Sequence, residues 1–164
     1  MMRTRPRLLV LLCVLLLSSC GFRLAGTNEL PETLARMSIA DSGFSKSQLK
    51  ALRRTLTSAG VELVQPGDDT AVQLSVTLQS GNDQQLATSA ASGEKVQRIS
   101  RGLTFNVKSA EGNVVAAQRT LSQQRDVVLD DDNLASSNRE KESVERELEQ
   151  ALYDQLVRQL ARLQ

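Results

Sequence analysis

Few side chains in this sequence could carry out catalysis. The 164 residues include no histidine and only two cysteines, Cys13 and Cys20. Every catalytic arrangement in which a histidine activates a serine or a cysteine is therefore excluded. Carboxylate chemistry alone would need two acidic side chains that converge in one pocket, which a sequence does not reveal. We predict a protein that is not an enzyme, with no catalytic residues and no cofactor.

The acidic run Asp130–Asp132 invites comparison with a calcium site. It lacks the glycine and the distal glutamate of an EF-hand loop. Negative charge just ahead of a helix is also favourable without any ion, because it compensates the positive end of the helix dipole. The sequence contains no zinc-ligand spacing and no glycine-rich phosphate loop. We therefore predict that the protein has no metal site.

The N-terminus has the pattern of an export signal. Arg3, Arg5 and Arg7 precede ten apolar residues, 8–17, and a basic segment followed by such a run is typical of a signal peptide. A membrane-spanning helix needs about 20 apolar residues. The run is therefore too short to serve as a permanent anchor, and we expect residues 1–19 to be removed.

Cys20 is the residue whose chemistry the sequence indicates most clearly. Residues 17–20, Leu-Ser-Ser-Cys, resemble the bacterial lipobox, in which cleavage between Ser19 and Cys20 leaves an acylated cysteine at the new N-terminus. Such cysteines carry an N-acyl chain and an S-diacylglycerol. Each buried methylene contributes about 0.8 kcal/mol, so several chains together anchor a protein durably in lipid. Gly21 stands where an aspartate would signal inner-membrane retention, which favours the outer membrane.

The mature chain has the size of one domain. Removal of residues 1–19 leaves 145 residues, of which 20–31 form a predicted tether and 32–164 a single domain. Cys13 is lost with the signal, so Cys20 has no partner for a disulfide within the chain. Loss of the three signal arginines leaves 17 basic against 19 acidic residues, a net charge of −2. This balance gives no reason to expect a nucleic acid as partner.

The first half of the domain predicts two short strands around a helix. Residues 37–40 and 61–64 are the strands. The helix between them begins with a capping box, Ser45 to Gln48, and ends at Gly60, which suits the left-handed conformation after a helix C-terminus. Residues 71–80 then alternate between apolar and polar side chains, as a strand with one buried and one wet face does.

The second half predicts two further strands and a long helix. Residues 96–108 and 114–124 are the strands, and the polar segment 81–94 is expected to be a mobile hairpin end outside the core. Apolar residues recur at helical spacing from Val144 to Leu163, with a helix start at Ser137 or as early as Asn133. We predict an α+β fold in which two helices pack on one face of a four- to five-stranded, mainly antiparallel sheet.

Three basic residues gather near the hairpin end, where they could meet an anionic ligand such as a phosphorylated lipid head. They are Lys95, Arg98 and Arg101. Arg98 and Arg101 are three residues apart, so a regular strand places them on opposite faces. The simpler interpretation is that all three lie on the solvated surface of an exposed strand.

The mature N-terminus resembles that of a known family. Residues 20–26 read Cys-Gly-Phe-Arg-Leu-Ala-Gly, and members of the LPS-assembly lipoprotein family (LptE) typically begin Cys-Gly-aromatic-basic-Leu-Arg-Gly. The matching positions after the cysteine are Gly21, Phe22, Arg23, Leu24 and Gly26. Residues 60–63, Gly-Val-Glu-Leu, and residues 155–160 also resemble this family, and the resemblance spans residues 20–164.

The resemblance implies a function at the outer membrane. It implies a 1:1 complex with the outer-membrane β-barrel protein LptD, in which the domain plugs the barrel, assists barrel assembly and binds lipopolysaccharide. Lys95 and Arg98 are the residues that we expect to contact the glycolipid. The alternative is a free-standing envelope lipoprotein that binds peptidoglycan or another surface component.

Overall fold

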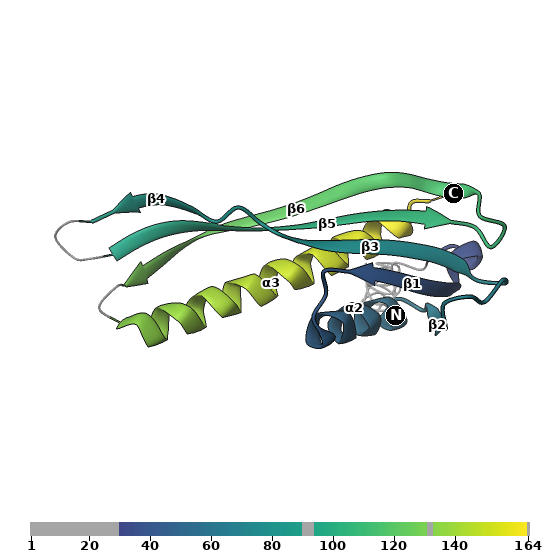
Figure 1. Ribbon diagram of the computed structural model, residues 1–164, viewed down its shortest axis with the longest axis horizontal. Helices are drawn as coiled ribbons and strands as arrows, with labels where there is room; N and C mark the ends of the chain where they lie inside the picture. Colours follow the sequence, from purple (N-terminus) through teal and green to yellow (C-terminus); the bar gives the residue numbers. More distant parts are fainter. Residues whose placement is uncertain (1–29, 90–93, 131–132, 164) are drawn as a thin grey trace, which may run out of the picture.

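The computed structural model describes residues 30–89, 94–130 and 133–163. Six strands form one mixed sheet, and two α-helices pack on the same face of it (Figure 1). Two strand pairs are parallel and three are antiparallel. The predicted two-layer α+β class is confirmed, with one strand more than expected.

The first unit is a strand, a helix and a parallel strand. The 3₁₀ helix η1 (Glu32–Leu34) leads into β1 (Arg36–Ser42), then α2 (Lys46–Ser58) and β2 (Glu62–Val64). The predicted capping box is present, because Ser45 Oγ accepts from the Gln48 N–H and Gln48 Oε1 accepts from the Ser45 N–H. Gly60 has φ +90° and follows the helix as predicted. Its N–H donates to the Thr57 carbonyl, which closes the helix end.

Three long strands form the centre and one edge of the sheet. They are β3 (Val72–Ser80), β5 (Glu94–Lys108) and β6 (Val114–Asp130). β5 lies between β3 and β6 and is antiparallel to both. β6 runs six residues past the predicted strand 114–124, and its 17 residues reach about 55 Å.

The extra strand is β4 (Gln84–Thr88), which lies in the segment predicted to be a hairpin end. It pairs with residues 95–98 of β5, on the same edge of β5 that β3 occupies further along. All five of its residues are exposed, so β4 lies outside the core, as expected for this part of the segment. β4, β5 and β6 form a narrow arm that extends beyond the rest of the sheet (Figure 1).

The second helix, α3 (Leu134–Leu160), joins the two ends of the molecule. Its 27 residues are about 40 Å long, and it runs beneath both the arm and the wider part of the sheet (Figure 1). It starts at the earlier of the two predicted positions, with Asn133 as the N-cap. Ser137, the later candidate, lies inside the helix. Its hydroxyl accepts a hydrogen bond from the Asp130 N–H and donates one to the Asp130 carbonyl.

Two separate apolar clusters lie between the helices and the sheet. The larger one fills the space under β1, β3 and the C-terminal half of β5, and includes Leu52, Leu103 and Leu156. The smaller one lies under the arm and consists of Ile99, Val127, Val144 and Leu148, with Leu129 beside them. Arg101 occupies the position on β5 between Ile99 and Leu103, so a charged residue lies where the two clusters meet.

No helix in the described part of the chain covers the opposite face of the sheet. The side chains there are mostly neutral hydroxyls and amides, which lie side by side on β3, β5 and β6. They are Gln73, Ser75, Thr77, Gln79, Ser100, Thr104, Asn106, Thr120, Ser122 and Gln124. Thr104 and Thr120 face each other across the ladder, with their hydroxyl oxygens 3.0 Å apart. The result is a broad polar surface with few charges.

Candidate functional site

The residues predicted for lipidation lie outside the described part of the chain. This holds for Cys20, for the cleavage position after Ser19, and for the family motif at residues 21–26. The tether expected over residues 20–31 is described only from Leu30, whose side chain packs against the larger apolar cluster. These assignments therefore stay predictions.

The predicted basic set is divided between the two faces of β5. Arg98 lies on the open face, where Nε and Nη2 donate to the two carboxylate oxygens of Asp126 at 2.7 and 2.9 Å. This contact lowers the pKa of Asp126, through the hydrogen bond first and the charge of Arg98 second. Lys95 and Arg101 share the other face, which is the side of the helices. Lys95 and Arg98 are thus not brought together on one surface.

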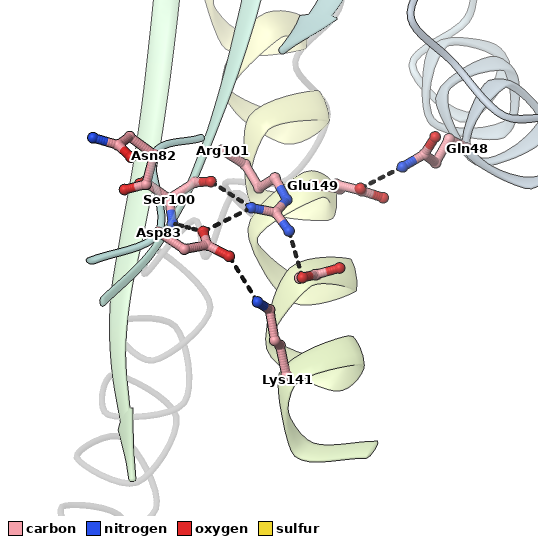
Figure 2. Close-up of polar contacts among 8 residues, drawn as sticks. Gln48, Asn82, Asp83, Ser100, Arg101, Lys141 and Glu149 are labelled. Atoms are coloured by element: carbon pink, nitrogen blue, oxygen red, sulfur yellow. Dashed lines mark hydrogen bonds and ion pairs between the residues drawn. The ribbon is translucent and has the colours of Figure 1, made fainter. Parts of the chain in front are cut away.

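Arg101 is the centre of an ion-pair network (Figure 2). Its side chain is only 11% exposed. Nη1 lies 3.1 Å from Asp83 Oδ1 and donates to the Ser100 carbonyl at 2.6 Å. Nη2 lies 2.5 Å from Glu145 Oε1 on α3. One guanidinium therefore connects β5, the β3–β4 connection and α3.

Asp83 holds the other side of this network. Lys141 Nζ on α3 lies 2.9 Å from Asp83 Oδ2, and the Ser100 N–H donates to Oδ1 at 3.3 Å. Burial opposes ionisation of Asp83, but the hydrogen bond from Lys141, the bond from Ser100 and the charges of Lys141 and Arg101 outweigh it. The pKa of Asp83 is consequently lowered. The carboxylate stays charged and fixes the start of β4 onto the helix.

A small cavity of about 210 Å³ lies beside this network. Arg101, Glu145 and Glu149 line it together with Gln48 and polar atoms at the end of β3. Glu149 is only 9% exposed, and it accepts a hydrogen bond of 2.5 Å from Gln48 Nε2 on α2 (Figure 2). The volume is below the 300 Å³ or more that pockets for drug-sized ligands usually have. A glycolipid would not fit in it.

Among the residues that the structure describes, Glu149 is the one buried carboxyl group whose pKa is raised. Burial is the main cause, and the charge of Glu145 adds to it, while Gln48 and Arg101 act in the opposite direction. Tyr153, one turn further along α3, is 1% exposed. Its ring stacks on that of Phe44, with the ring centroids 6.4 Å apart. Burial and then the charge of Glu149 raise the pKa of its hydroxyl. These groups join the two helices and are shielded from solvent.

Glu149→Gln is expected to gain stability relative to the wild type as the pH rises from about 4 to 7. Because its pKa is raised in the folded state, Glu149 binds its proton more tightly there than in the unfolded chain. Ionisation above the ordinary glutamate value of 4.5 therefore costs stability, and glutamine avoids that loss. Urea denaturation at a series of pH values measures it. Glu142→Gln, exposed on the same helix, controls for the removed charge; a pH-independent difference for Glu149→Gln would contradict the assignment.

The network is suited to holding elements together rather than to binding or catalysis. The charged atoms of Arg101 and Asp83 are directed at one another, which leaves little for a ligand. Among the described residues no group of three or more acidic or thiol side chains could hold a metal ion. None of the described helices combines the length and hydrophobicity that crossing a membrane requires.

Two features of the sequence point to this network. Arg101 interrupts the alternating apolar series of β5 between Ile99 and Leu103, and a charge in such a series needs a buried partner. Lys141 and Glu145 are spaced four residues apart, so they lie on the same face of α3. Neither signal identifies Asp83, because the sequence does not show which strand residues face the helix.

The fold is shared with three solved structures at low identity. The minor lipoprotein from Acinetobacter baumannii has a TM-score of 0.63 and 21% identity, over 78% of this chain and 93% of its own. Lipoprotein B from Nitrosomonas europaea has a TM-score of 0.67 and 16% identity, over 86% of this chain and 90% of its own. Rare lipoprotein B from Shewanella oneidensis has a TM-score of 0.64 and 18% identity, over 77% of this chain and 93% of its own.

These likenesses establish the fold alone. No family model matches the sequence, and no curated protein is similar to it in sequence. The chain shares the fold of the minor lipoprotein, lipoprotein B and rare lipoprotein B structures.

Proposed function

We propose that this chain is a non-catalytic outer-membrane lipoprotein of lipopolysaccharide assembly. Acylation of Cys20 anchors it in the inner leaflet of the outer membrane, facing the periplasm. Its domain sits inside the barrel of LptD in a 1:1 complex, where it plugs the lumen, assists barrel assembly and binds lipopolysaccharide.

The fold is the observation that carries this proposal. Each of the three similar structures is a protein described as a lipoprotein, and the likeness extends over 90% or more of its length. The sequence supplies the matching N-terminal feature, a lipobox that ends at Cys20. An LptE-like fold and a lipobox on the same chain support an acylated envelope protein of that kind.

The open face of the sheet supports a position inside a barrel. The lumen of a transmembrane β-barrel is polar, and a protein that fills it needs a surface that is neither apolar nor strongly charged. The hydroxyl and amide side chains on β3, β5 and β6 meet this requirement. They can exchange hydrogen bonds with a polar wall at little desolvation cost.

Arg98 is the better placed of the two proposed glycolipid contacts. It lies on the open face of the arm, and only its Nε and Nη2 are directed at Asp126. The Nη1 donors are outside this pair and can bind an anionic oxygen such as that of a phosphate. Lys95 is half-buried on the helix side of the same strand, so the two residues would contact a ligand from different sides of the arm.

The test is co-purification from detergent-solubilised outer membranes with an affinity-tagged full-length chain. The proposal predicts a large β-barrel protein in stoichiometric amount, and recovery of the wild type in the outer-membrane fraction. Mass spectrometry of the purified wild type is expected to show acyl chains on Cys20, and Cys20→Ala is expected to lack them, because the cysteine is the residue that carries them.

Cys13→Ala is the matched control. It removes the other cysteine, which lies within the signal, and is expected to leave acylation and membrane recovery unchanged. A wild-type chain that is acylated but brings down no barrel protein would exclude the LptD role and favour a free-standing lipoprotein. A wild-type chain whose Cys20 carries no acyl chain by mass spectrometry would exclude the acyl anchor.

A further inference from the structure

One outer edge of the sheet is long and unpaired. β6 has 17 residues, and among the described strands only β5 pairs with it. It forms the outermost line of the sheet in Figure 1, with no other ribbon beyond it. The two other outer strands are poor templates for a further strand, because β2 has only three residues and β4 has five with a shift of register. β6 is therefore the edge at which another chain can pair.

A hydrogen bond on β5 shows which backbone groups of β6 point away from the sheet. In an antiparallel pair each residue directs its N–H and C=O to the same side, and successive residues alternate. The Ser100 N–H donates to Asp83, on the side of β5 opposite β6 (Figure 2). Gln124, which lies opposite Ser100 in the register, is therefore in a non-hydrogen-bonded pair, and its N–H and C=O point outward. The same alternation turns outward the backbone groups of Thr120, Ser122, Asp126 and Val128.

The charged side chains along this edge are directed back onto the domain. Arg119 and Arg125 bond side chains of α3, and Asp126 pairs with Arg98 on β5. Charges on an edge strand normally oppose the approach of another strand. Here each of the three has a partner within the domain, so the outward backbone groups between positions 119 and 128 are left open to an incoming strand.

The two faces of β6 define the kind of strand that fits beside it. The open face is polar at Thr120, Ser122 and Gln124, whereas Leu121 and Val127 are buried on the helix side. A strand added at this edge continues both faces, so it should carry polar side chains on one side and apolar side chains on the other. Transmembrane β-strands alternate in this way, with polar residues toward the lumen and apolar residues toward lipid.

We propose that the outer edge of β6 pairs through its backbone with a transmembrane strand of LptD before that barrel closes. The identity of the partner rests on the proposed function. Residues 119–130 keep an unbroken register with β5 and span about 40 Å, which is enough for a whole transmembrane strand of about ten residues. A closed barrel has no unpaired strand. The contact therefore belongs to assembly, and the strand leaves β6 when the barrel closes around the domain.

The test follows newly made LptD in cells whose only copy of this chain is full-length and affinity-tagged. After a radioactive pulse the tagged chain is captured at successive times. Gel electrophoresis without boiling then separates the bound LptD into folded and unfolded forms. The inference predicts that unfolded LptD is captured first and declines as the folded form appears.

Ser122→Pro combined with Gln124→Pro removes two outward N–H groups and no hydrogen bond to β5. Proline is tolerated on an edge strand where its nitrogen faces solvent. Capture of unfolded LptD should fall roughly 30-fold, from the usual net contribution of two hydrogen bonds, and folded LptD should appear more slowly. The matched control, Ser122→Val with Gln124→Val, changes the same side chains but keeps both N–H groups, and it should behave as the wild type.

Urea denaturation of the purified variants checks that they fold. Should the double variant not fold, Ser122→Pro and Gln124→Pro carry the test singly, each with roughly a fivefold loss of capture. Three results overturn the inference: no capture of unfolded LptD by the wild type, equal capture by a folded proline variant, or an equal loss in the valine control. A mature chain that dimerises in light scattering and loses the dimer with proline also overturns it, because a second copy then occupies the edge.

These outcomes are separate from a failure of the proposed function. In each of them folded LptD still co-purifies at steady state, because the contacts inside the closed barrel do not use the edge of β6. An absence of both folded and unfolded LptD would instead contradict the proposed function itself.

Discussion

Arg101→Ala is expected to lower the free energy of unfolding by about 2–3 kcal/mol. The substitution leaves the carboxylates of Asp83 and Glu145 in a site that was shielded by the guanidinium, and their side chains are only 19% and 28% exposed. Breaking a fully buried ion pair costs about 3–5 kcal/mol, and partial exposure reduces that figure. Urea denaturation monitored by circular dichroism measures the change.

Arg98→Ala is the matched control, since it removes the same side chain three residues earlier on β5. Its ion pair with Asp126 has side chains that are 36% and 44% exposed, and solvent screens an exposed pair so strongly that it contributes little to stability. We therefore expect Arg98→Ala to cost less than half as much as Arg101→Ala. Equal effects would contradict the distinction between a structural arginine and a surface arginine.

Gly81→Ala is expected to destabilise the protein by about 3 kcal/mol and to loosen β4. A Cβ at this position would lie 1.8 Å from the carbonyl oxygen of Ser100, and a backbone atom of a central strand cannot move aside. Overpacking commonly costs about 1–3 kcal/mol, and this contact is at the upper end. The connection must shift away from β5, which separates Asp83 from Arg101. Faster amide hydrogen exchange in residues 84–88 would report the loosening.

Gly102→Ala separates this steric effect from the general cost of replacing a strand glycine. Its Cβ would come closest to Gln79 Oε1, at 3.2 Å, and that side chain can rotate, while the next neighbours lie at ordinary contact distances of 3.6 and 3.7 Å. We expect a change within about 1 kcal/mol and unaltered exchange in β4. Because Gly81→Ala and Arg101→Ala break the same contact, their combined effect should be smaller than their sum; full additivity would show that the contact does not couple them.

Local patterns explain how much of the fold could be predicted. The capping box at Ser45 and the glycine at position 60 define the two ends of α2 within 15 residues of sequence. Strand β3 alternates without interruption, and the apolar stripe of α3 continues from Val144 to Leu160. Helix and strand formation depend on neighbours a few residues apart, so these elements are visible in the sequence.

The end of β6 and all of β4 could not be predicted in this way. Arg125 and Asp126 interrupt the apolar pattern of β6, and β4 has no buried residue at all. Both segments are strands because β5 offers backbone hydrogen-bonding groups along its two edges, and β4 pairs with one edge while β6 pairs with the other. Arg98 also lies opposite Asp126 in the register, where opposite charges stabilise the pairing.

The sequence by itself excluded catalysis that depends on histidine, predicted acylation at Cys20 and determined the class of the fold. Only the tertiary structure decided the roles of the charged residues. Lys95, Arg98 and Arg101 look equivalent in the sequence, yet one strand face commits Arg101 to Asp83 and Glu145 while the other leaves Arg98 at the surface. The energy of a charge depends on its distance to other charges and to water. Those distances are set by residues far away along the chain, which come together only when the sheet and α3 are packed.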